Sequence, residues 1–403
     1  MHLLAAASDR ADTANAIAEV LDTLERAMAQ DGLERAPDLL VVQTSANHDI
    51  AAIQAVARKA GVPTLHGATT SQGVMTGGRM VAEGGNGLGA LALWDGGGAY
   101  ASAAAALGED PRTAARRATE RALDKAGRAG EAPDLIWLGV APGREEAVIA
   151  GIEDAVGANT PILGGSAADN AITGAWCVFD GDAHHADGVV VSVLFTSAPV
   201  ALAYQSGYAP AQHAGTVTRA EGRTIHEIDG EAATAVYARW TGGRIAPNIC
   251  HGPANVLAES TFHPLGRPLG AVAEVPFHLL AHPAVARPDG GLELFADVAV
   301  GERLQAMTGS VESLTARAGR VAALALRQGG LAPEDIAGAL VVYCGGCMLG
   351  VRAQMDAVAA DVDNALGGAP SLGLFTFGEQ GPVVGGRNRH GNLMISCVVF
   401  AKA

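Results

Sequence analysis

The sequence predicts an α/β protein in which one unit of strand, helix, strand, helix, strand, loop and strand is repeated. Two observations predict this class. Apolar stretches with the spacing of strands alternate along the chain with stretches that have the spacing of helices. In addition, a motif that begins with proline and continues into small and polar residues occurs three times, at Pro63, Pro161 and Pro370. We therefore expect mixed, mostly parallel sheets with an inserted α+β segment.

The first repeat unit is expected over residues 1–97. Its first helix, over residues 12–30, has apolar side chains at helical spacing, and its second, over residues 48–60, is preceded by Ser45 and Asn47. The Pro63 motif follows the second helix. The strands of this unit are expected at residues 2–7, 39–44 and 87–94.

The second unit repeats this order over residues 98–197. Asp38 and Asp134, which each open a strand, are separated by almost the same number of residues as Pro63 and Pro161. Two landmarks with nearly the same offset, in the same order, indicate a duplication. The strands are expected at residues 99–107, 135–140 and 188–195, and the helices at residues 110–126 and 144–156.

The third unit is expected over residues 292–403, after a segment over residues 198–291 that matches no repeat. This intervening segment is expected to hold short strands and a helix near residues 231–240. Residues 1–197 would then form one domain of two units, and residues 292–403 a C-terminal domain. The third unit's strands are expected at residues 292–300, 339–344 and 393–400, and its helices at residues 311–328 and 353–366.

Charge and composition exclude several classes of protein. The chain of 403 residues has a formal net charge of −15, so it repels nucleic acid and anionic membranes. Five scattered cysteines argue against a disulfide scaffold and favour a reducing cytoplasm. The N-terminus lacks the basic segment and long apolar stretch of a signal peptide, and no stretch has the ~18 apolar residues of a spanning helix. We therefore expect a cytoplasmic protein without nucleic-acid or membrane partners.

The three proline motifs are expected to carry the functional site, because ligands of open α/β sheets bind beyond the carboxyl ends of strands. Gly164 and Gly165 would let a ligand approach the backbone. His66 occupies the position that Gly164 and Gly373 occupy in the other motifs, so its side chain is expected to point near the cleft. The candidate ligand-binding residues are Ser166, Asp169, Asn170, Thr376, Glu379, Arg387, His390, His66 and Ser71.

These polar residues have a second interpretation, in which Asp169 and Asn170 only cap backbone groups of a sharp turn. Thiols and imidazoles supply further candidates. Cys344 and Cys347 form a C-x-x-C pair that fits a redox pair, half of a zinc site, or packed thiols, and Cys250-His251 is the other compact group. The 12 histidines could include a haem ligand. No phosphate-binding glycine motif, G-x-S-x-G elbow or recognisable carboxylate pair indicates an enzyme.

Several motifs, taken in order, resemble the FIST domains. Gly164 to Asn170, followed by Val178-Phe179-Asp180-Gly181 and Gly188-Val189-Val190-Val191, is similar to the N-terminal FIST domain. So are Val217 to Gly222 and Ile228 to Ala232. Tyr343-Cys344, Leu349-Gly350 and the run from Gly373 to Pro382 are similar to the FIST C domain. The resemblance covers nearly the whole chain.

The resemblance implies a cytoplasmic sensory module that binds a small ligand and signals to a partner such as a histidine kinase or a cyclase. Amino acids are the ligands proposed for such domains, and one stand-alone subgroup looks like haem proteins that sense nitric oxide. We therefore expect a non-enzymatic sensor, with haem as a candidate cofactor. The alternatives are an amino-acid sensor without haem, a cysteine-dependent enzyme, and a scaffold without ligand. We expect the ligand between the second and third motifs, with the His66 motif as a less certain wall.

Overall fold

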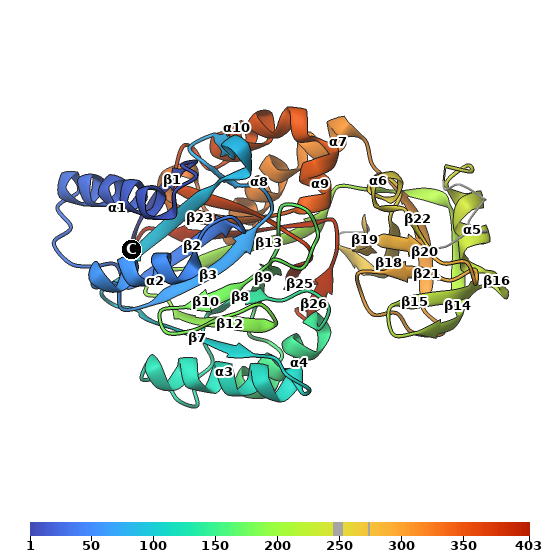
Figure 1. The fold of residues 1–403 in the computed structure, drawn as a ribbon, viewed down its shortest axis with the longest axis horizontal. Helices are drawn as coiled ribbons and strands as arrows, with labels where there is room; N and C mark the ends of the chain where they lie inside the picture. The colour runs from blue at the N-terminus through green and yellow to red at the C-terminus, as the bar shows by residue number, and fades with distance from the viewer. Residues whose placement is uncertain (245–252, 273–274) are drawn as a thin grey trace.

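The computed structural model describes residues 1–244, 253–272 and 275–403. A large body of sheets and helices carries a smaller, strand-rich lobe on one side (Figure 1). Within the described residues, the body contains three six-stranded sheets and the lobe a nine-stranded one. The predicted mixed α/β class is confirmed.

Each sheet of the body combines four strands of one repeat unit with a hairpin from another. The first sheet has the order β1 (His2–Ser8), β6 (Leu88–Trp94), β2 (Leu39–Ser45), β3 (Leu65–Thr70), β10 (Val178–Asp180), β11 (His184–His185). The second has the order β26 (Asn388–Gly391), β25 (Glu379–Pro382), β9 (Ile162–Ser166), β8 (Leu135–Val140), β12 (Gly188–Phe195), β7 (Ala99–Ala106). The third has the order β13 (Val200–Ser206), β27 (Met394–Ala401), β23 (Ile336–Cys344), β24 (Ser371–Thr376), β4 (Val74–Thr76), β5 (Arg79–Val81).

The hairpins are therefore exchanged in a cycle. The first unit gives β4–β5 to the third sheet, the second gives β10–β11 to the first, and the third gives β25–β26 to the second. Each sheet has one parallel pair, β2–β3, β8–β9 or β23–β24, and its other pairs are antiparallel. The parallel share is smaller than expected because the closing strand of each unit returns antiparallel between the first two.

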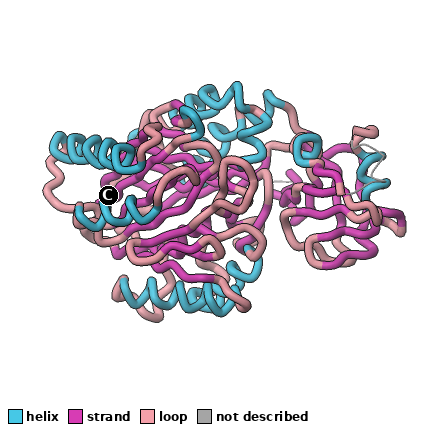
Figure 2. Tube along the Cα trace, viewed as in Figure 1, coloured by secondary structure: helices cyan, strands magenta, loops and turns pink. Residues whose placement is uncertain are grey.

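Apolar side chains on both faces of the strands explain why these segments are hydrophobic throughout. In β2, Leu39 and Val41 belong to a core that residues of all three sheets share, while Leu40 and Val42 pack against the helices of the first unit. Figure 2 shows these helices on the outside of the body. The paired helices are α1 (Thr13–Gln30) and α2 (Ile50–Lys59), α3 (Pro111–Lys125) and α4 (Glu145–Val156), and α8 (Arg317–Gly329) and α10 (Met355–Ala365).

Helix starts follow local capping chemistry. The side chain of Asp12 accepts a hydrogen bond from the Asn15 N–H at the start of α1, and Asp110 does the same for Thr113 before α3. The start of α2 is capped by Asp49 rather than by the expected Ser45 or Asn47. These caps satisfy N–H groups that have no partner within the helix.

The expected first strand of the third unit, over residues 292–300, is wrong. The edge strand of the third sheet is β13, which pairs with β27 and lies before the lobe. The lobe is inserted between β13 and the helices of the third unit. The first strand of that unit is therefore β13, which lies almost one hundred residues before the position expected from the sequence. Leu292–Leu294 forms β21, which pairs with two strands of the lobe.

We call the described part of residues 209–308 the β lobe. It contains two short helices. One of them, α5 (Ala233–Trp240), was expected from the sequence. No helix in the described part of the chain is long and apolar enough to cross a membrane. The lobe contains β14 (Ala209–Glu221), β15 (Thr224–Ile228), β16 (Glu231–Ala232), α5, β17 (Ala254–Asn255), α6 (Leu257–Ser260), β18 (Leu265–Val272), β19 (Val275–Ala281), β20 (Pro283–Ala286), β21 and β22 (Arg303–Thr308). The body continues with α7 (Val311–Thr315) and later α9 (Gly345–Gly350).

Replacing Gly67 by alanine should destabilise the body where an exchanged hairpin joins the first sheet. A Cβ at Gly67 would overlap the ring of Phe179, which is fully buried on β10. We expect a loss of about 1–3 kcal/mol, as for other overpacked core sites. Gly181→Ala is the control, because a Cβ there meets no atom within 4 Å. Urea denaturation of both variants checks this, and equal stability would contradict the packing described.

Candidate functional site

The three proline motifs meet inside the body. The Ala168 N–H donates to the Thr69 carbonyl at 2.9 Å, which joins the second motif to the first. The Ser166 N–H donates to the Gly378 carbonyl at 2.7 Å, and the Ser71 N–H to the Phe375 carbonyl at 3.0 Å. The exchanged hairpins therefore bring together the carboxyl ends of β3, β9 and β24.

Asp169 and Asn170 organise the loop that follows β9. Burial alone would raise the pKa of Asp169, but hydrogen bonds from backbone N–H groups, including that of Ala175 at 2.8 Å, bring it below its usual value. The Asn170 side chain accepts from the Gln72 N–H at 2.7 Å. Both residues thus shape the loop, as in the turn-capping interpretation. The loop holds Ile172, which is 46% exposed, at a φ of 57°, a conformation that is unusual for a β-branched residue.

Ser166 belongs to a buried polar network. Its hydroxyl donates to Glu145 Oε1 at 2.7 Å and accepts from Gln380 Nε2 at 3.3 Å. The same Gln380 nitrogen lies 3.2 Å from His390 Nδ1, so Ser166 and His390 are connected as members of one site. Glu145 and Gln380 were not among the predicted residues. Glu145 could have been found, because it begins the helix that follows the carboxyl end of β8.

Arg223 connects this network to the β lobe. It lies in the turn between β14 and β15, and its Nη2 is 2.7 Å from both Glu145 Oε2 and Glu146 Oε2. Burial would raise the pKa of Glu145, but His390 and Arg223 bring it below its ordinary value. Arg223 also donates to the Phe295 carbonyl at 2.8 Å. No local sequence pattern indicates Arg223, because its partners are more than seventy residues away.

Thr376 and Glu379 form a second buried group beside the thiols. The Thr376 hydroxyl donates to Glu379 Oε1 at 2.8 Å, and the Met394 N–H donates to Oε2 at 2.9 Å. Burial, and then the nearby Cys344 thiol, raise the pKa of Glu379 well above its usual range. We infer that this carboxyl group is protonated at neutral pH, because no cation compensates its charge among its described neighbours.

A cavity of about 510 Å³ lies between the body and the β lobe. In Figure 1, α9 of the body faces α6 of the lobe at this position. From the body it is lined by Pro142, Ile172, Trp176, Cys344, Gly346, Leu349, Gly350, Phe377 and Asn392, and from the lobe by Asn255, Leu257, Ala258, Thr261, Phe262, His282 and Phe295. Residues near the second and third motifs therefore form its wall, and the described lining includes none from residues 1–97.

Cys344 and His282 are the titratable side chains of this lining. Burial raises the pKa of Cys344 well above its usual value, so the thiol is protonated and is a weak nucleophile. Burial lowers the pKa of His282 to about 4, so its imidazole is neutral. His282 Nε2 lies 3.3 Å from the Leu257 carbonyl. Cys347 is buried outside the lining, with its Sγ 3.4 Å from the Tyr208 hydroxyl.

None of the nine predicted ligand-binding residues belongs to this lining. His66 does not point to a cleft: it is fully buried on β3, with Nδ1 2.7 Å from Ser192 Oγ on β12. Strand alternation directs its side chain between the first two sheets, towards Trp137. Ser71 is buried where the first and third motifs meet, and Arg387 is exposed in the turn between β25 and β26.

The described residues form no group of three or more His, Cys, Asp or Glu side chains able to hold a metal ion. The predicted Cys250-His251 group lies outside the described residues. Cys344 and Cys347 therefore have no third ligand of this kind in the described part, and their interpretation as half of a zinc site gains no support.

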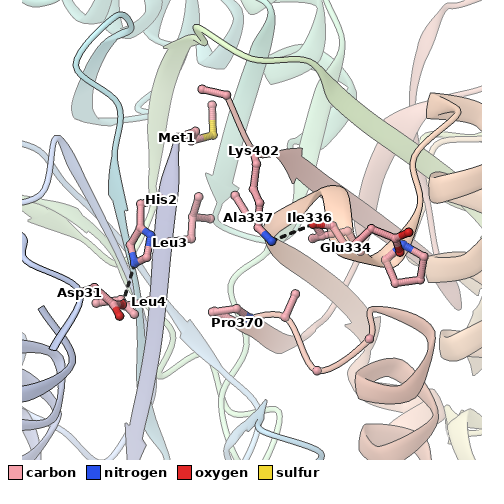
Figure 3. A pocket seen from close by; sticks show the side chains of 15 residues that line it. Met1, His2, Leu3, Leu4, Asp31, Glu334, Ile336, Ala337, Pro370 and Lys402 are labelled. Atoms are coloured by element: carbon pink, nitrogen blue, oxygen red, sulfur yellow. Dashed lines mark hydrogen bonds and ion pairs between the residues drawn. The ribbon is translucent and has the colours of Figure 1, made fainter.

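A second cavity, of about 680 Å³, lies where β1 and β23 approach the C-terminus (Figure 3). Two pairs of its lining residues are in contact: His2 Nε2 is 2.9 Å from Asp31 Oδ2, and Lys402 Nζ donates to the Glu334 carbonyl at 2.7 Å. The nine predicted ligand-binding residues line neither this cavity nor the one between body and lobe, but the latter is lined by the candidate thiol Cys344 and by residues that flank the second and third motifs. The cavity between body and lobe is therefore the better candidate.

Comparisons with known proteins agree with the motifs. The FIST N domain matches residues 38–231, and the FIST C domain matches residues 233–382. No curated protein matches the chain. Among solved structures, a cyanuric acid hydrolase from A. caulinodans has 10% identity and a TM-score of 0.39, with 100% of this chain and 99% of that chain covered. PurLQS from Thermotoga maritima has 9% identity and a TM-score of 0.21, with 76% and 73% covered. Both TM-scores are below 0.5, so neither likeness bears on function.

His66 should make the protein less stable in mild acid. Burial lowers its pKa to about 3, below the ordinary value of 6.5. As the pH falls below 6.5, the unfolded chain binds a proton that the folded chain does not, so the free energy of unfolding decreases. Between pH 6.5 and pH 5 this contribution is about 2 kcal/mol.

His66→Leu should remove that part of the pH dependence, as measured by urea denaturation at several pH values. His213→Leu, at an exposed histidine, is the control for loss of an imidazole. An unchanged slope in His66→Leu would show that His66 is protonated in the folded protein.

Removing Arg223 should destabilise the contact between body and lobe. Arg223→Met leaves Glu145 buried without the Arg223 guanidinium, which we expect to lower the free energy of unfolding by about 3 kcal/mol. Arg239→Met is the control, because both partners of the Arg239–Glu231 pair are 57% exposed. In the double variant Glu145→Gln/Arg223→Met part of the loss should be recovered, and additive losses in urea denaturation would contradict this pairing.

Proposed function

The chain belongs to the FIST family, and on that premise we propose that it is a non-enzymatic sensor whose ligand occupies the cavity between the body and the β lobe. FIST domains are small-ligand sensory domains. The observation that carries the proposal is the origin of the cavity wall, to which both parts of the chain contribute aromatic side chains. A ligand there contacts both parts at once, and its affinity depends on how they are arranged.

The contacts around the cavity suggest how binding would be transmitted. The Phe295 carbonyl, beside the cavity, accepts a hydrogen bond from Arg223 and lies 3.1 Å from His390 Nε2. The His282 N–H donates to Asn392 Oδ1 at 3.2 Å across the same boundary. A ligand that binds one arrangement of these contacts better than another shifts the population towards it. A cytoplasmic partner such as a histidine kinase or a cyclase would respond to that shift.

The most specific sensor that the family resemblance implies is a haem protein that senses nitric oxide. The cavity lining does not fit haem. Its propionate groups need cationic or hydrogen-bonding partners. None of the described residues that line the cavity is Lys or Arg. The Cys344 thiol is protonated by virtue of its raised pKa, and His282 Nε2 faces a backbone carbonyl. We therefore derive no step through haem.

A cysteine-dependent enzyme is the second candidate, because Cys344 lines the cavity. The thiolate is the reactive form of cysteine, and burial raises the pKa of this thiol. The nearby Glu379 also has a raised pKa, so it does not act as an anionic base at neutral pH. The sensor is the better supported function.

Closing the cavity should abolish ligand binding without unfolding the protein. Ala258 is an exposed residue of α6 that lines the cavity, so Ala258→Trp fills the mouth from its rim. In a thermal-shift screen of amino acids, neutral aromatics, nucleosides and haemin, a ligand at 100 times its Kd adds about 2.7 kcal/mol of stability to the wild type. We expect the variant to lose that gain.

Ala18→Trp, at an exposed position of α1, is the matched control and should keep the gain. A ligand that stabilises wild type and Ala258→Trp equally binds elsewhere and overturns the assignment of the cavity. Thiol-dependent turnover that disappears in Cys344→Ser would instead establish the enzyme.

A further inference from the structure

The lining of the cavity carries information about the charge of its ligand. Of the residues that the structure describes, none that lines the cavity is Asp, Glu, Lys or Arg. A buried charge without a partner is strongly unfavourable, so this cavity selects against charged ligands.

The charged groups of the Glu145 network are already engaged with each other. Glu145 accepts from Ser166 and pairs with Arg223, which also pairs with Glu146. Arg223 has a further partner in Asp297, 3.0 Å away. A carboxylate that entered the cavity would therefore have to break this network to pair with Arg223.

The polar side chains of the lining are also largely engaged. The Thr261 hydroxyl donates to the Leu257 carbonyl at 2.7 Å, and Asn392 Oδ1 accepts from the His282 N–H. Asn392 Nδ2 lies 3.4 Å from His390 Nε2. The thiol of Cys344 adds only a weak donor and acceptor. The cavity thus presents few hydrogen-bonding groups to a ligand.

The apolar part of the lining is suited to a planar ring. Trp176 and Phe377 lie edge to face with their ring centroids 6.2 Å apart, and Phe262 and Phe295 line the cavity from the lobe. Aromatic side chains in such arrangements pack well against another ring. Ile172, exposed at the rim in its unusual backbone conformation, adds apolar surface at a point where strain often marks a functional site.

We propose that the ligand of this cavity is an uncharged, mainly apolar molecule that contains a planar ring. The proposal rests on the proposed function and narrows it: a zwitterionic amino acid and a dianionic porphyrin both lack partners for their charges here. Specificity for this ligand would come from the shape of the aromatic part of the lining and from the absence of ionic partners.

Indole and L-tryptophan form the matched test, because they share one ring system. L-Tryptophan carries in addition an ammonium and a carboxylate group, which have opposite charges. Isothermal titration of the full chain should show that indole binds at least tenfold more tightly than L-tryptophan. Ala258→Trp should weaken indole binding at least tenfold, whereas Ala18→Trp should leave it unchanged. Nile red, a larger neutral dye, should bind the wild type with a blue-shifted emission and be displaced by indole.

The outcomes separate this inference from the proposed function. If L-tryptophan binds more tightly than indole and this binding is lost in Ala258→Trp, the proposal of an uncharged ligand is wrong, but the assignment of the ligand to this cavity stands. A Soret band with haemin that is lost in His282→Ala would lead to the same conclusion, with haem as the ligand. If neither indole nor Nile red binds, the inference is wrong. If Ala258→Trp alters the binding of no probe of any class, the assignment of the ligand site to this cavity is wrong.

Discussion

Each sheet of the body depends on a hairpin that belongs to another repeat unit. Without β10–β11, β3 would be an edge strand with unpaired N–H and carbonyl groups, and the same holds for β9 without β25–β26 and for β24 without β4–β5. Because the exchange runs in a cycle, no unit completes its own sheet. The shared core, with side chains such as Leu39, Trp137 and Leu340 from the three sheets, depends on the same closure.

This exchange also determines where polar groups gather. The chain must leave the carboxyl end of one sheet and cross to the next, so each crossing segment passes the same central region. The crossing segments contain the polar motifs, and their hydrogen bonds to one another hold the three sheets together. Asp169 shows the consequence: its carboxylate is fully used by the backbone of its own loop. The polar residues of the motifs therefore hold the crossing segments in place, and none of them lines the cavity.

The β lobe makes one side of this symmetric arrangement different from the others. It is inserted after β13 and contacts the body beside the second and third motifs, where Arg223 reaches Glu145 and His282 meets Asn392. The cavity exists because this added lobe covers the carboxyl end of β23 and the start of α9. In the proposed sensor, ligand binding would depend on the relative position of the two parts, since His282 and Asn392 both line the cavity and bond across the boundary.

Local pattern determined much of the body. The hydrophobic patterns of residues 39–44, 135–140 and 12–30 and the repeated prolines were sufficient to predict the strands, the helices and the repetition, because they depend on neighbours in the chain. The tertiary structure alone decided the hairpin exchange, the place of β13 in the third sheet and the pairing of Arg223 with Glu145, since these join residues whose separation carries no local signal. It also decided that His66 packs between sheets while Cys344 lines a cavity. His66 lies within a hydrophobic strand and Cys344 ends one. Only the packing of the sheets and the lobe determines which of the two side chains lines a cavity.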